Sequence, residues 1–127
     1  MNILLVEDNQ TDLKLFSAVL QSSGHRVFEN GSAEQAMEEI KRRQPEVILL
    51  DLNLPGMDGL ALARQLKQDA ATKHIPIVAI TAAAEQFSRV AALAAGCDAY
   101  ITKPVNTRKL SEQLTEATAG SHRSGTP

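Results

Sequence analysis

The chain has 127 residues, with 13 Lys and Arg against 15 Asp and Glu and a formal net charge of −2, which suits one domain rather than two. This charge balance gives no reason to expect nucleic acid or an anionic membrane as a partner. No apolar run is long enough to span a bilayer, no basic signal-peptide segment opens the chain, and Cys97 is the one cysteine, so we expect a cytoplasmic protein without disulfides.

Short apolar runs alternate with amphipathic segments along the chain. Leu13, Phe16 and Leu20 recur at helical spacing, and Ser32 with Gln35 forms a capping box that opens a second helix. Apolar runs that stop at a polar residue are typical of strands buried in a parallel sheet. We predict strands at 2–6, 26–29, 47–50, 77–80 and 99–102, and helices at 11–23, 32–40, 60–66, 86–95 and 106–119.

The alternation of strands and helices predicts the architecture. It implies a parallel sheet with helices on both faces, the doubly wound α/β class. Right-handed crossover connections leave few topologies for such a sheet. All its strands share one carboxyl edge, so the polar residues that follow the strands should converge there: Glu7, Asp8, Asp51, Thr81 and Lys103.

The segment 45–59 lies at the centre of this arrangement. Its apolar run from Val47 to Leu50 ends at Asp51, and ligands of open α/β sheets bind at that end of the strands. A lone Asp after a strand more commonly caps the next turn. The other polar residues predicted at the same edge of the sheet favour a functional role for the Asp51 carboxylate instead.

The predicted cluster has the chemistry of a phosphoryl-accepting metal site. The carboxylates of Glu7, Asp8 and Asp51 would repel one another, and a hard divalent cation such as Mg²⁺, with Mn²⁺ as an alternative, would relieve this. Asp51 is suited to be the nucleophile of aspartyl-phosphate chemistry. Lys103 and the Thr81 hydroxyl could bind phosphoryl oxygens, and the small side chain of Ala82 leaves room for the group.

Four motifs at strand ends resemble those of response-regulator receiver domains of two-component signalling, of the chemotaxis-regulator-like type. They are V-E-D-N at 6–9, L-L-D-L-N-L-P-G-M-D-G at 49–59, I-T-A at 80–82 and Y-I-T-K-P at 100–104. The resemblance covers residues 1–119. It implies a flavodoxin-like fold with strand order 2-1-3-4-5 and five helices, and a single-domain, bacterial signalling protein with a flexible tail at 120–127.

The resemblance also implies a role for each matching residue. Asp51 resembles the phosphoacceptor, Glu7 and Asp8 the acidic pair that binds Mg²⁺, and Lys103 the phosphate-sensing lysine. The Lys103–Pro104 bond resembles the cis peptide of the family. The remaining matches are the backbone carbonyl of Asn53 as a metal ligand, and Thr81 and Tyr100 as the switch pair.

The family implies a phosphorylation-controlled binding protein rather than an enzyme. A histidine kinase or histidine phosphotransfer protein would phosphorylate Asp51. If Thr81 then moves inward, Tyr100 can swing into the vacated space and reshape a surface for a downstream protein target, formed near Arg89, Val90, Tyr100 and Lys109. Two alternatives stay open: a small phosphatase with an aspartyl nucleophile, and a scaffold that works without phosphorylation.

Overall fold

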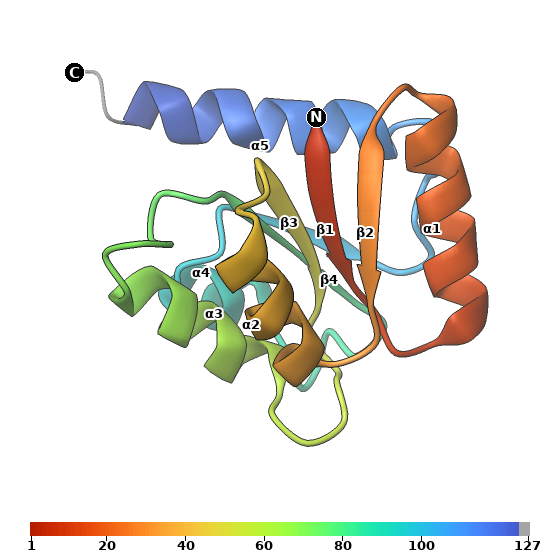
Figure 1. The fold of residues 1–127 in the computed structure, drawn as a ribbon. Helices are drawn as coiled ribbons and strands as arrows, with labels where there is room; N and C mark the ends of the chain where they lie inside the picture. Colours follow the sequence, from red (N-terminus) through yellow and green to blue (C-terminus); the bar gives the residue numbers. More distant parts are fainter. Residues whose placement is uncertain (125–127) are drawn as a thin grey trace.

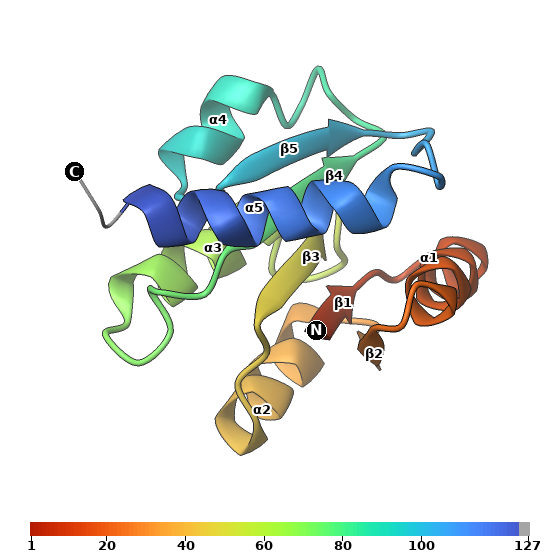
Figure 2. The same ribbon diagram turned by 90° about the horizontal axis from the view of Figure 1, so that it is seen from above.

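A computed structural model describes the backbone of residues 1–124 and the side chains of residues 1–119. Its centre is a five-stranded parallel sheet in the order β2-β1-β3-β4-β5, as predicted. Figure 1 shows the sheet among its helices, and Figure 2 shows β5 beside β4. The described elements, in chain order, are β1 (Asn2–Val6), α1 (Gln10–Ser22), β2 (Arg26–Asn30), α2 (Ala33–Arg42), β3 (Val47–Asp51), α3 (Gly59–Gln68), β4 (Ile77–Thr81), α4 (Arg89–Ala94), β5 (Ala99–Thr102) and α5 (Leu110–Ser124).

The two strands at the middle of the sheet are buried along their whole length. Every residue of β3 and β4 is buried, which is expected of a parallel sheet covered on both faces. The register pairs Val6 of β1 with Leu50 of β3, so Asp51 extends one residue beyond the end of β1. Asp51 pairs in turn with Ile80 of β4, and this register brings the ends of the central strands to one edge.

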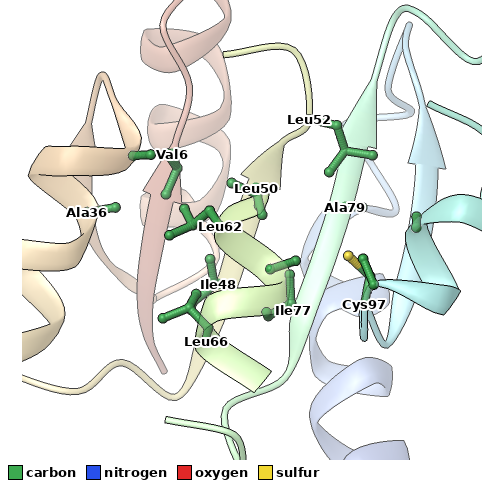
Figure 3. Close-up of a cluster of buried hydrophobic side chains, with 14 of the residues drawn as sticks. Val6, Ala36, Ile48, Leu50, Leu52, Leu62, Leu66, Ile77, Ala79 and Cys97 are labelled. Carbon is green, nitrogen blue, oxygen red and sulfur yellow. The ribbon is translucent and has the colours of Figure 1, made fainter. Parts of the chain in front are cut away.

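Alternate strand side chains supply two separate cores. Helices α2, α3 and α4 cover one face of the sheet, where Ile48, Leu50 and Leu62 belong to one buried cluster (Figure 3). Helices α1 and α5 cover the other face, where Leu49 packs in a second cluster with residues of both helices. Figure 2 shows α4 and α5 on opposite sides of β5. Cys97 is buried in the first cluster, as its apolar character suggests.

The sequence placed the starts of two helices too early. Helix α4 begins at Arg89, whereas the prediction began at Gln86, because the backbone turns at Ala83 and the Ser88 hydroxyl caps the helix by accepting from the Ala91 N–H at 3.1 Å. Helix α5 begins at Leu110 and not at Asn106. There the Asn106 side chain accepts from the Arg108 N–H at 3.1 Å, an Asx-type turn that competes with helix formation.

The other end of α5 also differs from the prediction. The helix continues to Ser124, five residues beyond the predicted end at Ala119. One glycine costs a helix only about 1 kcal/mol, which does not end a helix whose earlier turns are anchored by the buried Leu110 and Leu114. The flexible tail was predicted at 120–127, but residues 120–124 continue the helix, and residues 125–127 lie outside the described residues. Among residues 1–124, no helix is long and apolar enough to cross a membrane.

Candidate functional site

The site forms where the carboxyl ends of β1, β3, β4 and β5 meet. Glu7 follows β1 directly, and its N–H donates to the Asn30 carbonyl at 2.9 Å, which fixes the turn between β1 and α1. Asp51 is the last residue of β3, and Lys103 follows β5. The Lys103 N–H donates to the Thr81 carbonyl at 2.8 Å, so the backbone that carries the lysine is tied to the end of β4.

Three carboxylates gather at this edge as predicted. One oxygen each from Glu7, Asp8 and Asp51 lies within 4.8 Å of the other two. Glu7 and Asp51 are buried, whereas Asp8 is exposed to solvent. An all-oxygen donor set with one exposed member fits a hard cation that keeps part of its water shell, which is how Mg²⁺ binds proteins.

The Lys103 ammonium stands at the centre of the acidic cluster. Its Nζ donates to Asp51 Oδ2 at 3.0 Å, to Glu7 Oε1 at 2.9 Å and to Asp12 Oδ2 at 2.9 Å. An ammonium group has three protons, so these three acceptors use its full donor capacity. The lysine thereby reaches the proposed nucleophile directly and offsets part of the negative charge around it.

The electrostatics of the cluster show an excess of negative charge. Burial, and next the neighbouring Asp51 carboxylate, raise the pKa of Glu7 from 4.5 to about 7, although Lys103 partly opposes this shift. Burial lowers the pKa of Lys103, but its bonds to the three carboxylates outweigh burial and hold that pKa above its ordinary value. A divalent cation would relieve the same excess that these shifts report.

Asp12 is a site residue that the sequence analysis missed. It lies in the first turn of α1, and its N–H is capped by Asn9 Oδ1 at 2.9 Å. The sequence analysis gave Asp12 no role beyond its place in the helix predicted at 11–23. The available signal was its place in the first turn of the helix that follows the acidic loop, because that turn starts at the edge of the sheet where the site lies.

Asn53 contacts Asp51 through its backbone, whereas the Thr81 hydroxyl bonds to a neighbouring backbone N–H. The Asn53 N–H donates to Asp51 Oδ1 at 2.9 Å, which leaves the Oδ2 of Asp51 for Lys103. Thr81 is fully buried, and its hydroxyl accepts from the Ala83 N–H at 2.9 Å. Thr81 therefore does not cap α4. Ala82, which lies between Thr81 and Ala83, is exposed, and its side chain is only a methyl group.

The Tyr100 side chain is already buried with Asp51 unmodified. Its hydroxyl donates to the Phe87 carbonyl at 2.5 Å, and the Arg89 guanidinium lies 5.1 Å from the ring centroid. The prediction had this ring move inward only after phosphorylation. Of the surface predicted for a partner, Arg89, Val90 and Lys109 are exposed and Tyr100 is not. The Lys103–Pro104 peptide bond is cis.

The chain belongs to the family of response regulator receiver domains. The model of that family, described as "Response regulator receiver domain", matches residues 3–115. The chain is therefore a receiver domain of two-component signalling, and its fold is the CheY-like flavodoxin fold.

Relatives and solved structures agree with this assignment. The polar-differentiation response regulator DivK of Brucella ovis is 33% identical over 113 residues, which cover 89% of this chain and 92% of DivK. A receiver domain protein (CheY-like) from Methanospirillum hungatei has a TM-score of 0.87 at 28% identity, covering 97% of both chains. The receiver domain of the sensor histidine kinase PA1611 from Pseudomonas aeruginosa has a TM-score of 0.84 at 34% identity, and the match covers 93% of this chain and 97% of that one. That receiver domain carries a magnesium ion coordinated in its active-site cleft.

Proposed function

We propose that Asp51 accepts a phosphoryl group from a phosphorylated histidine of a kinase or phosphotransfer protein, and that this modification controls the binding of a downstream protein. The observation that carries the proposal is the placement of the Asp51 carboxylate. It ends a buried strand, lies within 4.8 Å of two further carboxylates, and contacts the ammonium of Lys103 at 3.0 Å. We place this reaction in the cytoplasm, where the kinase domains of two-component systems act.

Each residue of the site has a separate role in the proposed phosphoryl transfer. An Asp51 oxygen attacks phosphorus, the O–P bond forms as the P–N bond of the phosphohistidine breaks, and the electron pair stays on the imidazole nitrogen. Lys103 donates to a phosphoryl oxygen, and the N–H of Asn53 holds the other Asp51 oxygen in place. Thr81 contributes its hydroxyl by turning from the Ala83 N–H toward the phosphoryl group.

The acidic cluster is suited to hold the metal that the transfer requires. Glu7, Asp8 and Asp51 supply carboxylate oxygens, and we assign a further ligand to the backbone carbonyl of Asn53. Mg²⁺, or Mn²⁺ in its place, supplies charge neutralisation for the incoming phosphoryl group when it is bound there. The exposed position of Asp8 leaves a path from solvent to the site.

We further propose that the exposed surface of α4, β5 and α5 transmits the signal. Phosphorylation adds about −1.5 to −2 charge and three acceptor oxygens beside Lys103 and Thr81. A rotation of Thr81 releases the Ala83 N–H, and the turn that begins at Ala83 carries Phe87, the acceptor of the Tyr100 hydroxyl. In this proposal a change in the turn alters the hydrogen bond between Phe87 and the Tyr100 hydroxyl, and the Tyr100 ring is already buried before phosphorylation.

The phosphoacceptor assignment is tested by the intact mass of the protein. We expect wild-type protein incubated with acetyl phosphate and Mg²⁺ to gain the mass of one phosphoryl group, and Asp51→Asn to gain none. Asp58→Asn is the matched control, because Asp58 is an acid in the segment between β3 and α3 that caps α3, and Asn caps a helix equally well. Equal labelling of wild type and Asp51→Asn would refute the assignment, because the phosphoryl group would then sit on another residue. A wild type that gains no phosphoryl group would favour the alternative of a phosphorylation-independent scaffold.

The proposed output surface is tested by amide chemical shifts. We expect beryllofluoride, which mimics the phosphoryl group, to shift amides from Ala83 to Lys109 in the wild type. In Thr81→Ala it should still bind at Asp51, but the shifts at α4 and β5 should be smaller. Shifts confined to the neighbourhood of Asp51 in the wild type would contradict a signal that reaches α4.

A further inference from the structure

Asp12 occupies a position that the proposed transfer does not yet explain. Its carboxylate belongs to α1 and accepts from Lys103 Nζ at 2.9 Å, as close as Glu7 and slightly closer than Asp51. It is not among the three carboxylates that converge within 4.8 Å of one another, so it is placed for the lysine and not for the metal. Its side chain is 30% exposed, whereas that of Lys103 is 15% exposed.

The lysine is held in place without Asp12. Glu7 Oε1 at 2.9 Å and Asp51 Oδ2 at 3.0 Å accept two of its three protons, and both carboxylates are buried. The backbone of Lys103 is anchored separately to the Thr81 carbonyl at 2.8 Å. Removing the carboxylate of Asp12 therefore frees one ammonium proton but does not release the ammonium from the site.

A phosphoryl group on Asp51 changes the balance around the ammonium. It brings three acceptor oxygens that need donors. The Lys103 proton now bonded to Asp51 can pass to one of them, but the proton bonded to Asp12 cannot while that bond persists. Asp12 also contributes a like charge close to that group. Because both carboxylates contact the same nitrogen, their bound oxygens lie no more than about 6 Å apart, well within the range of strong charge repulsion.

We propose that Asp12 is a positioning residue that competes with the phosphoryl group for Lys103 and so limits how strongly the site holds its phosphorylated form. The inference rests on the proposed function, because it assumes that Asp51 is the phosphoacceptor. The helix N-terminus keeps the Asp12 carboxylate in place for this competition, since Asn9 caps the Asp12 N–H and the first turn of α1 favours a negative charge.

The inference predicts opposite effects on an anion and a cation at the same site. Without the Asp12 charge, the site should bind a phosphoryl mimic more tightly, because a competing acceptor and a like charge are gone. It should bind Mg²⁺ equally or more weakly, because one nearby negative charge is gone. Loosening of the site by a purely structural defect would instead weaken both.

The test compares Asp12→Asn, Asp12→Ala and wild type by calorimetric titration. Beryllofluoride is titrated at saturating Mg²⁺, and Mg²⁺ is titrated separately without fluoride. We expect beryllofluoride affinity to rise about tenfold in Asp12→Asn, which corresponds to about 1.4 kcal/mol. It should rise at least as much in Asp12→Ala, which has no acceptor at all. Glu38→Gln is the control, because it removes an exposed charge of α2 that is bonded only to Lys41.

The outcomes separate this inference from the proposed function. Beryllofluoride affinity that is unchanged or weaker in both Asp12 variants, while the wild type binds normally, would overturn the role of Asp12 and leave Asp51 as the phosphoacceptor. An equal rise in Glu38→Gln would also overturn it, because the effect would then come from net charge alone. Failure of the wild type to bind beryllofluoride at all would overturn the proposed function and, with it, this inference.

Discussion

Replacing Asp51 by Asn should stabilise the metal-free protein although it abolishes phosphorylation. Asp51 lies within 4.8 Å of the carboxylates of Glu7 and Asp8 and 3.0 Å from Lys103 Nζ. Asn keeps the acceptor for the Asn53 N–H, and Lys103 keeps Glu7 and Asp12 as partners. The substitution therefore removes charge repulsion without leaving the lysine unpaired.

The magnitude follows from these distances. At an effective dielectric constant of about 20, each repulsion near 5 Å is worth about 3–4 kcal/mol and the attraction to Lys103 about 5–6 kcal/mol. The repulsions and the attraction nearly balance, because solvent screens the exposed Asp8 and the raised pKa of Glu7 leaves it only partly charged at neutral pH. The balance favours Asn because the substitution also removes the cost of keeping a charge at the buried Asp51 position. We expect a net gain of about 1–2 kcal/mol, which raises the melting temperature by about 4–8 °C for a domain of this size.

Thermal or urea unfolding in EDTA at neutral pH measures this effect. Asp58→Asn is again the matched control and should leave the melting temperature nearly unchanged. Saturating Mg²⁺ should reduce or reverse the advantage of Asp51→Asn, because the metal stabilises the wild type by binding to it. A melting temperature of Asp51→Asn that falls below that of the wild type in EDTA would show that the Lys103 attraction dominates, contrary to this reasoning.

Three further predictions concern single side chains. Asp8→Ala should lower Mg²⁺ affinity at least tenfold by calorimetry, because one of three converging carboxylates is lost; wild-type affinity would exclude Asp8 as a ligand. Tyr100→Phe should lower the free energy of unfolding by about 1–2 kcal/mol in urea, because the buried Phe87 carbonyl loses its donor; an unchanged value would show that this bond adds no stability. Burial raises the pKa of the Cys97 thiol from 9.0 to about 11, so the unfolded chain ionises first and stability falls between those pH values. Wild type should lose about 2–3 kcal/mol more than Cys97→Ala over that interval, and parallel pH profiles of the two proteins would contradict the shift.

The sequence predicted the fold because its local signals agree with one another. The apolar run that ends at Asp51 is too short for a helix and too uniformly apolar for an exposed strand, and the structure buries all of it. The strand-end polar residues Glu7, Asp8 and Lys103 converge because parallel strands share one carboxyl edge. Their convergence follows from the order of the strands and helices alone, and the apolar periodicity of the sequence indicates that order well.

The details that the sequence did not reveal depend on side-chain packing and competing turns. Asp12 reaches Lys103 only because the first turn of α1 faces the end of β5, and no periodicity encodes that contact. The buried state of Tyr100 depends on an acceptor in the turn before α4, a turn whose Ser88 cap was overlooked. Helix boundaries are likewise set by local hydrogen bonds, such as the Asn106 turn before α5.

The central claim is that Asp51 is the residue that carries the phosphoryl group, and chemical mapping tests it most directly. Protein incubated with acetyl phosphate and Mg²⁺ is treated with borohydride, which reduces an aspartyl phosphate to homoserine, and the peptides are then sequenced by mass spectrometry. We predict the mass change of that reduction at position 51 and not at Asp8, Asp12 or Asp58. Reduction at any other carboxylate, or at none while the intact protein gains a phosphoryl group, would contradict the account.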